Sequence, residues 1–207
     1  MGQRIKVLIL FSFSISFAFN IIMKVKNYKR IVDSQSELTE LMIPSYANFG
    51  GKVHGGILLS LMDKVAYVCA SKHAGSYCVT VAVDGVEFLS PVEVGDLVSL
   101  KASVNYVGNT SMIIGIRVES LNPRTQLKKH TNSCYFTMAA KDDAGNLLQV
   151  PGLIIETEEQ LRRFCEGKHL KSLSKQKREL LKSDLSRYTK DELIGMVLYD
   201  RCTLIFA

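Results

Sequence analysis

Residues 48–63 of the chain read Asn48-Phe-Gly-Gly-Lys-Val-His-Gly-Gly-Ile-Leu-Leu-Ser-Leu-Met-Asp63. Two glycine pairs, at 50–51 and 55–56, stand on either side of the Val-His dipeptide. Glycine lets backbone approach a ligand closely, and a glycine-rich turn that opens a helix leaves backbone N–H groups pointing outward. Those groups, with the positive end of the helix dipole, can stabilise developing negative charge. The stretch therefore predicts a helix whose first residues belong to a functional site.

The predicted helix is apolar almost all round. The residues that recur at helical spacing are Leu58, Leu61, Met62, Val65, Ala66 and Cys69. Such a helix is buried rather than laid on a surface, and we expect it to end before a loop at 71–77. Asp63 lies inside it, and a buried carboxylate is costly unless it is paired or takes part in chemistry. Asp63 is therefore a candidate catalytic residue, with a structural hydrogen-bonding role as the alternative.

The chain beyond residue 77 alternates between apolar and polar residues, as half-buried strands do. The clearest run is 98–106, where Val, Leu, Ala, Val and Tyr alternate with Ser, Lys, Ser and Asn. The other runs and the turns between them lie at 79–83, 108–109, 112–120, 122–123, 134–140 and 143–146. One buried helix followed by antiparallel strands, without strand–helix alternation, predicts an α+β fold in which a curved sheet wraps around the helix.

Two motifs resemble a known family. Ala-Asn-x-x-Gly-x-Val-His-Gly-Gly at 47–56, followed by Leu-Met-Asp at 61–63, is similar to the hot-dog-fold acyl-CoA thioesterases of the brain acyl-CoA hydrolase type. The resemblance covers residues 37–155 and includes Val-Gly-Asn-Thr-Ser-Met at 107–112. It implies the hot-dog fold, a curved antiparallel β-sheet around a long buried central helix. It also implies hydrolysis of fatty acyl-CoA to a free fatty acid and coenzyme A.

The resemblance also implies roles for single residues. Asp63 matches a catalytic carboxylate, and Asn48 matches a catalytic or water-orienting amide that comes from the opposing subunit. Thr110 and Ser111 match a turn near the bound coenzyme A. Asn109 stands where the family commonly has Arg. That departure leaves the details of the coenzyme A contact open, but not the Asn48 and Asp63 assignment.

Thioester cleavage itself asks for such groups. Attack on the carbonyl carbon builds charge on the carbonyl oxygen, so the enzyme needs donors for that oxygen and a base or nucleophile opposite. The N–H groups near Gly55 and Gly56 can act as the donors, and Asp63 as the base or nucleophile. His54 either polarises the carbonyl or holds the loop through a ring hydrogen bond, and we favour the orienting role.

Helix length predicts a dimer. Asp63 follows Gly56 along the helix at a distance of about 10 Å, whereas a base must lie within roughly 3 Å of the group that it deprotonates. One helix can hardly supply both ends of a site, but two antiparallel copies across a twofold axis can. We therefore expect a homodimer with shared active sites, with a trimer of dimers as the larger alternative.

Composition places the chain among globular proteins. Of its 207 residues 47% are hydrophobic and 22% charged, and the net charge of +6 suits an anionic ligand. The five cysteines are odd in number and form no Cys-x-x-Cys pair, so neither a disulfide framework nor a zinc site is supported. No metal and no cofactor are expected, since coenzyme A is part of the substrate. We expect His73, His130 and His169 to be surface residues.

The chain divides into four parts. Residues 1–23 are an apolar extension that reads as a signal peptide, a membrane anchor or an upstream segment with Met23 as the true start, and we favour the third. A membrane contact is expected only if this run is an anchor. Residues 24–156 form the predicted thioesterase domain, 157–185 a basic helix, and 186–207 a tail without an interpretation. Acyl-CoA pools and unpaired cysteines both favour the cytoplasm.

The basic helix at 157–185 has two interpretations. It could touch the coenzyme A phosphates, an acidic partner or a membrane, or it could be a solvated helix packed on one side of the domain; we favour the second. A non-catalytic acyl-CoA sensor would need a DNA-binding module, and nothing before Asn48 has room for one, so no nucleic acid is expected. A hydratase on the same fold would carry Asp and His close together on the helix approach, which is absent.

Overall fold

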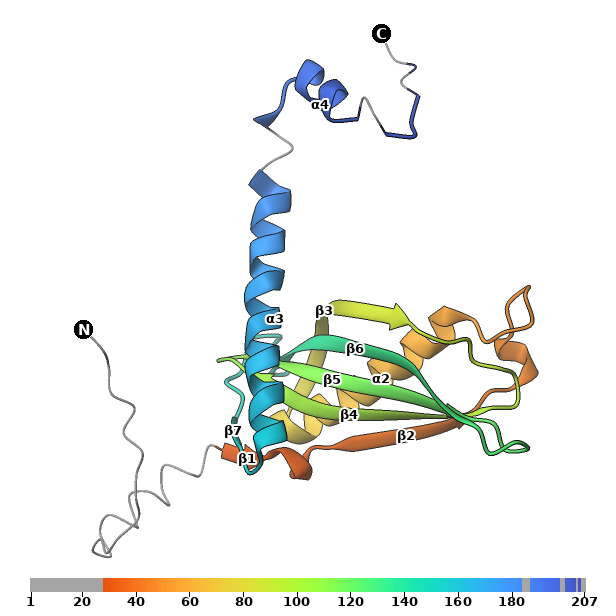
Figure 1. The fold of residues 1–207 in the computed structure, drawn as a ribbon. Helices are drawn as coiled ribbons and strands as arrows, with labels where there is room; N and C mark the ends of the chain where they lie inside the picture. The colour runs from red at the N-terminus through yellow and green to blue at the C-terminus, as the bar shows by residue number, and fades with distance from the viewer. Residues whose placement is uncertain (1–27, 184–186, 198–199, 204, 206–207) are drawn as a thin grey trace, which may run out of the picture.

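The computed structural model describes residues 28–183, 187–197, 200–203 and 205. Figure 1 shows its elements, which in chain order are β1 (Tyr28–Arg30), the 3-10 helix η1 (Ile31–Asp33), β2 (Ser36–Leu41), the 3-10 helix η2 (Pro44–Tyr46), α2 (Gly55–Ala74), β3 (Tyr77–Phe88), β4 (Leu97–Val107), β5 (Ser111–Leu121), β6 (Lys128–Lys141), β7 (Gly152–Ile154), α3 (Glu158–Ser183) and α4 (Lys190–Val197). The apolar run predicted at the N-terminus lies outside the described residues. No helix among the described residues has the length and apolar character needed to cross a membrane.

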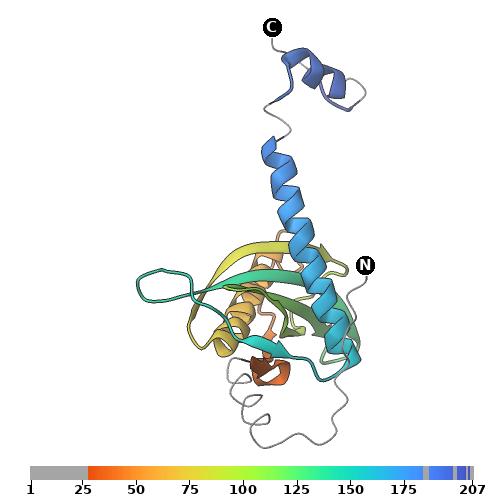
Figure 2. The same cartoon turned by 90° about the vertical axis from the view of Figure 1, so that its left-hand side faces the viewer.

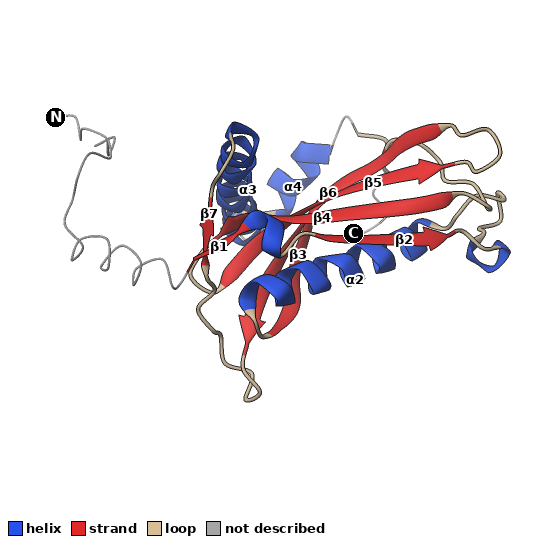
Figure 3. Ribbon diagram, turned by 90° about the horizontal axis from the view of Figure 1, so that it is seen from below, coloured by secondary structure: helices blue, strands red, loops and turns tan. Residues whose placement is uncertain are grey.

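Five strands form one antiparallel sheet in the order β2-β4-β5-β6-β3. The sheet curves around α2, which lies along its concave side, as Figures 1 and 3 show. A second, parallel pair, β1 and β7, closes one end of the sheet. The predicted α+β arrangement, a curved antiparallel sheet around a central helix, is confirmed.

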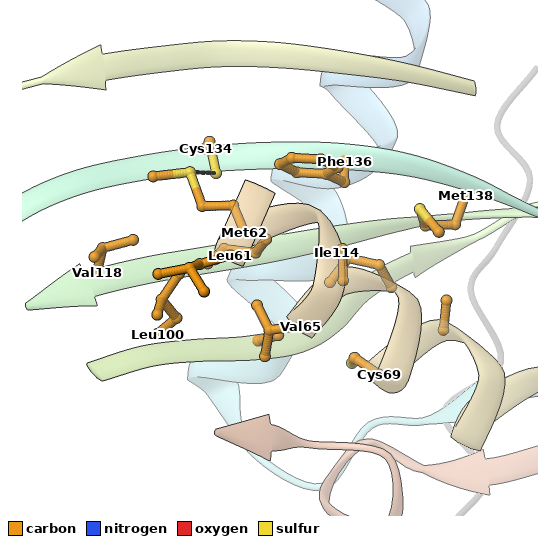
Figure 4. Close-up of a cluster of buried hydrophobic side chains, with 14 of the residues drawn as sticks. Leu61, Met62, Val65, Cys69, Leu100, Ile114, Val118, Cys134, Phe136 and Met138 are labelled. Atoms are coloured by element: carbon orange, nitrogen blue, oxygen red, sulfur yellow. Dashed lines mark hydrogen bonds between the residues drawn. The ribbon is translucent and has the colours of Figure 1, made fainter. Parts of the chain in front are cut away.

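The core lies between α2 and the sheet. Figure 4 shows Leu61, Met62 and Val65 of α2 facing side chains from β4, β5 and β6. Met62 is fully buried, and the Cys134 Sγ lies 3.5 Å from its Sδ. Burial raises the pKa of the Cys134 thiol to about 12, so this thiol is unreactive at neutral pH.

One face of α2 is buried, and all six apolar residues named in the sequence analysis lie on it. The expectation that Asp63 is buried with them is wrong for the single chain. The opposite face is open, and Asp63 lies on it as an exposed residue. The same face carries apolar side chains, with Tyr67 40% and Val68 43% exposed. The open face mixes charged residues such as Asp63 and Lys64 with apolar ones, so the apolar content of the helix did not reveal which residues the sheet covers. An apolar helix face left open by one chain marks a surface for a partner.

The end of α2 also differs from the prediction. The helix continues to Ala74 and stops at Gly75, whose φ of +70° is the left-handed conformation that ends helices. His73 is therefore helical and fully buried, not a surface residue. It faces the core because the helix brings it one turn beyond Cys69 and Ala70, which are buried as well.

Strand β3 forms one edge of the sheet and is irregular. It pairs with β6 on one side, and within the described residues no strand lies on its other side. Its register shifts twice, between Thr80 and Ala82 and between Asp84 and Glu87. Val81 on this edge is 54% exposed. The open face of α2 and the free edge of β3 therefore adjoin.

Helix α3 crosses the outer face of the sheet. It begins with a capping arrangement, in which Gln160 N–H donates to the Thr157 hydroxyl at 3.2 Å and the Gln160 side chain accepts from Glu156 N–H at 2.7 Å. It packs on β4 through Gly167, where an added Cβ would lie 2.7 Å from the Tyr106 Cβ. Figures 1 and 2 show that α3 then continues past β3 and away from the sheet.

Candidate active site

Asn48 lies in the loop between η2 and α2. Its side-chain Oδ1 accepts from Gly50 N–H at 2.8 Å and from Lys52 N–H at 3.2 Å. The Asn48 N–H and the Lys52 carbonyl close the loop at 2.7 Å. Among the described residues, the Nδ2 group of Asn48 has no hydrogen-bond partner. The carbonyl half of this side chain thus holds the loop, while the NH2 half is available as a donor.

His54 caps the start of α2. Its backbone is extended, with φ −65° and ψ 130°, and its Nδ1 accepts from Gly56 N–H at 2.9 Å. A neutral imidazole that accepts at Nδ1 carries its proton on Nε2, which is then a donor. The Gly56 N–H is occupied by this contact, whereas the Gly55 N–H has no acceptor among the described residues. Gly55 is therefore the backbone donor that remains for a ligand, and His54 orients the helix start.

Asp63 is held by a strand residue that the sequence analysis did not single out. The Thr80 hydroxyl on β3 donates to Asp63 Oδ1 at 2.5 Å. Both side chains are exposed on the single chain. Thr80 was visible in the sequence only as a polar residue in an alternating strand, and nothing there placed it opposite Asp63. The contact fixes the orientation of the carboxylate on the open face of α2.

An open cavity of about 530 Å³ lies beside this pair. Its lining residues come from α2 and the first half of β3, and they are Asp63, Lys64, Tyr67, Val68, Tyr77, Cys78, Val79 and Thr80. The Tyr67 and Tyr77 rings in this lining form a tilted pair, with centroids 6.2 Å apart and an interplanar angle of 60°. Burial raises the pKa of the Cys78 thiol, so this thiol is not an activated nucleophile. Asp63 is the acidic group of this cavity.

The turn predicted to lie near coenzyme A joins β4 to β5. Gly108 N–H donates to the Ser111 carbonyl at 2.7 Å, and the Thr110 carbonyl accepts from Ala140 N–H at 3.1 Å. Ser111 Oγ accepts from Lys171 Nζ of α3 at 3.2 Å. The turn is therefore held in one conformation and touched by α3.

Apart from the turn at Thr110 and Ser111, the predicted site residues form three separate groups on one chain. Asn48 binds its own loop, His54 and Gly56 bind each other at the helix start, and Asp63 binds Thr80 further along α2. Within the described part of the chain, no hydrogen bond joins Asp63 to either of the other groups. Over the same residues no three His, Cys, Asp or Glu side chains gather as a metal site would require.

Comparison with known proteins gives concordant results. The family model of the thioesterase superfamily matches residues 50–126. Protein VdlD of Helicobacter pylori is 46% identical over 127 residues, which make up 61% of this chain and 72% of that protein. The human cytosolic acyl coenzyme A thioester hydrolase is 34% identical over 137 residues, 65% of this chain and 36% of the human protein. This chain therefore matches about a third of the human protein's length.

Solved structures share this fold over about three quarters of the chain. An apo-hexameric acyl-CoA thioesterase matches with a TM-score of 0.71 and 34% identity, over 75% of this chain and 99% of its own. The acyl-CoA hydrolase of Staphylococcus aureus, solved with butyryl coenzyme A, coenzyme A and coenzyme A disulfide, matches with a TM-score of 0.71 and 26% identity, over 77% of this chain and 98% of its own. Three further structures of that hydrolase carry alanine in place of one threonine, one aspartate or one asparagine.

Proposed function

The chain belongs to the thioesterase superfamily and is an acyl-CoA hydrolase, and from this premise we propose how its residues cleave the thioester. The site is built from two protomers. One protomer supplies the start of α2, with the Gly55 N–H, His54 and Asn48. The partner's Asp63, oriented by Thr80, supplies the carboxylate.

One observation carries this proposal. Asp63 lies on the open face of α2 beside the free edge of β3, whereas the donors lie at the start of the same helix. The rise of an α-helix separates Gly55 from Asp63 by about 12 Å, too far for one thioester to reach both. A second copy, packed on that open face, brings the start of its α2 toward Asp63.

The reaction needs few groups. Asp63 takes a proton from water as the water oxygen attacks the thioester carbon, and the carbonyl oxygen gains negative charge. The Gly55 N–H, at the positive end of α2, and the Asn48 NH2 group donate to that oxygen. When the carbon–sulfur bond breaks, the departing thiolate takes the proton held by Asp63. Direct attack by the carboxylate, through an anhydride that water then cleaves, uses the same groups.

Residue spacing supports the choice of Asn48, Asp63 and Thr80. In the Staphylococcus aureus hydrolase the mutated asparagine precedes the mutated aspartate by fifteen positions, and the mutated threonine follows it by seventeen. Asn48 and Thr80 stand at the same two separations from Asp63 in this chain. That those three residues were chosen for mutation in a related hydrolase agrees with a joint role for their counterparts here.

The decisive experiment measures release of coenzyme A thiol from a panel of acyl-CoA chain lengths. Asp63→Ala should lower kcat by at least ~10²–10⁴-fold, the range for loss of a general base, while the circular dichroism spectrum stays that of wild type. Asp143→Ala changes an exposed carboxylate in the turn after β6 that has no part in the proposed site; it is the control and should leave kcat unchanged. The exposed thiols of Cys165 and Cys202 contribute a fixed background to the assay. Wild-type turnover by Asp63→Ala would refute the assignment.

No metal or further cofactor has a part in this mechanism. A carboxylate, N–H donors and water account for each bond that forms or breaks, so we propose that coenzyme A enters only as part of the substrate. Prolonged dialysis against a chelator should leave kcat unchanged. Loss of activity that added Mg²⁺ or Zn²⁺ restores would contradict this. The free cysteines and the cytosolic relative support a cytosolic location.

A further inference from the structure

Lys171 of α3 lies over the turn that joins β4 to β5. Its Nζ donates to the Ser111 hydroxyl at 3.2 Å and lies 5.4 Å from the centroid of the Tyr106 ring. The side chain is partly buried. Figure 2 shows how α3 reaches this place, since the helix crosses the outer face of the sheet. The Lys171 ammonium group of α3 is therefore held against the β4–β5 turn.

Two glycines make room for this ammonium group. A Cβ at Gly108, in the turn, would collide with the Lys171 Nζ. A Cβ at Gly167, one turn earlier on α3, would lie 2.7 Å from the Tyr106 Cβ and would force the helix away from β4. The aromatic face adds a favourable cation–π contact. The local structure thus accommodates a positive charge at this position.

The charge of Lys171 has no carboxylate partner among the described residues. Other cations of α3 do have one: Arg162 and Arg163 both bind Glu159. The acidic group that α3 meets nearby is Asp84, which accepts from the Ser174 hydroxyl at 3.1 Å. A partly buried ammonium group without a counter-charge is unfavourable unless an anion is supplied. Its three protons exceed the one acceptor that Ser111 offers, so donors remain for a ligand.

We propose that Lys171, together with the Ser111 hydroxyl, binds a phosphate group of the coenzyme A part of the substrate. An ammonium group and a hydroxyl are suitable phosphate ligands, and the turn itself carries no charged residue from Gly108 to Ser111. Lys168, about one turn before, adds to the positive potential, whereas Lys175 is paired with Glu179. The inference rests on the proposed acyl-CoA hydrolase function. It gives α3 a part in substrate recognition rather than in the chemical step.

The test compares two substrates that share one thioester. Acyl-CoA carries phosphates, whereas the matching acyl-pantetheine carries none. Lys171→Met should lower the ratio of kcat/KM for acyl-CoA to kcat/KM for acyl-pantetheine roughly 10–100-fold, the effect of losing one hydrogen bond to a charged group. Lys171→Arg should keep most of that ratio. Lys175→Met, an exposed lysine of the same helix, is the control and should keep all of it.

A binding measurement separates this inference from the proposed function. Adenosine 3′,5′-diphosphate, titrated into the full chain by calorimetry, should bind Lys171→Met roughly 10–100-fold more weakly than wild type. If wild type cleaves neither thioester, the proposed function fails, while this titration still decides the role of Lys171. An unchanged substrate ratio with unchanged affinity would overturn the inference. If Lys171→Met does not fold, Lys171→Gln, which keeps a donor to Ser111 without the charge, replaces it in both measurements.

Discussion

Asn48 uses the two halves of its amide for different purposes. Its Oδ1 accepts two backbone N–H groups of its own loop, and its NH2 group remains for the substrate. Aspartate at this position keeps the acceptor and removes the donor, whereas alanine removes both. The two substitutions therefore separate loop stability from catalysis.

Asn48→Asp should fold with a melting temperature close to that of wild type and lose roughly 10²–10³-fold in kcat, the range for an oxyanion donor. Asn48→Ala should lose as much activity and some stability as well, since two backbone donors lose their acceptor. Single-turnover rates and thermal melts measure the two effects. A loss confined to acyl-CoA affinity would instead make Asn48 a binding residue.

Thr80 is a positioning residue, because its hydroxyl acts on the substrate only through Asp63. Thr80→Val, which keeps the shape of the side chain, should lower kcat roughly 10–100-fold with little change in KM. Thr80→Ser keeps the hydroxyl and should recover most of the rate. The comparison of kcat for the two variants is the test. Equal rates for valine and serine would show that the hydrogen bond is irrelevant to turnover.

The sequence was enough to predict Asn48, His54 and Asp63 as site residues. It did not predict the contact between Asp63 and Thr80. Asn48, His54 and Asp63 stand in one glycine-rich stretch whose local pattern has chemical meaning. Thr80 is recognisable only when the sheet places β3 beside α2, a contact between residues distant in sequence. Burial failed as a guide for Asp63 for the same reason, because a helix in a sequence does not show which face a sheet will cover.

At the scale of elements, His73 joins the end of α2 to the segment before β7. The ring is fully buried, and its Nε2 lies 2.9 Å from the Pro151 carbonyl oxygen. The Nδ1 has no hydrogen-bond partner among the described residues. Burial lowers the pKa of His73, although the Pro151 carbonyl opposes the shift and Lys29 adds to it. The histidine is therefore neutral in the folded chain near neutral pH.

This makes the link between α2 and β7 sensitive to acid. The unfolded chain protonates this histidine near pH 6.5, while the folded chain resists protonation to a lower pH, so the unfolded state binds more protons. The free energy of unfolding should therefore decrease as the pH falls below 6.5. In the His73→Gln variant, whose side chain can still donate to the Pro151 carbonyl, the free energy of unfolding should decrease less steeply with falling pH. Urea titrations between pH 5 and 8 provide the measurement, and parallel curves for both proteins would contradict it.

The order of elements was predictable, whereas some of their ends were not. Alternation identified the long strands because each has one buried and one outward face. The loop expected at 71–77 was placed too early, since α2 extends to Ala74 before Gly75 ends it. In the tail at 186–207, which had no interpretation, α4 makes up Lys190–Val197. A short element with no periodic pattern offers nothing to read from the sequence.

At the scale of the whole molecule, the sheet covers only one side of α2. The concave side of the sheet is filled by α2, and α3 crosses the outer side, but one face of α2 and the β3 edge have no cover within the described residues. If each site takes its donors from one protomer and Asp63 from the other, a monomer contains no complete site. The arrangement leads to a test that does not depend on any single mutant's rate.

Two inactive mutants, Asn48→Asp and Asp63→Ala, should therefore restore activity when refolded together. In a mixed dimer one site carries both changes and the other carries neither. Random assortment of equal amounts makes about half of the dimers mixed, so roughly a quarter of wild-type activity should return. Each mutant refolded with itself is the control, and two affinity tags establish that mixed dimers formed. No recovery from verified mixed dimers would mean that both residues act within one subunit.

The two register shifts of β3 affect how readily the monomer aggregates before it dimerises. An exposed sheet edge with valines such as Val81 invites other strands to add to it, which is how aggregation begins. The shifts at Thr80–Ala82 and Asp84–Glu87 interrupt the regular ladder that a foreign strand needs. The β3 edge is therefore a poorer template for strands of other proteins than a regular edge would be.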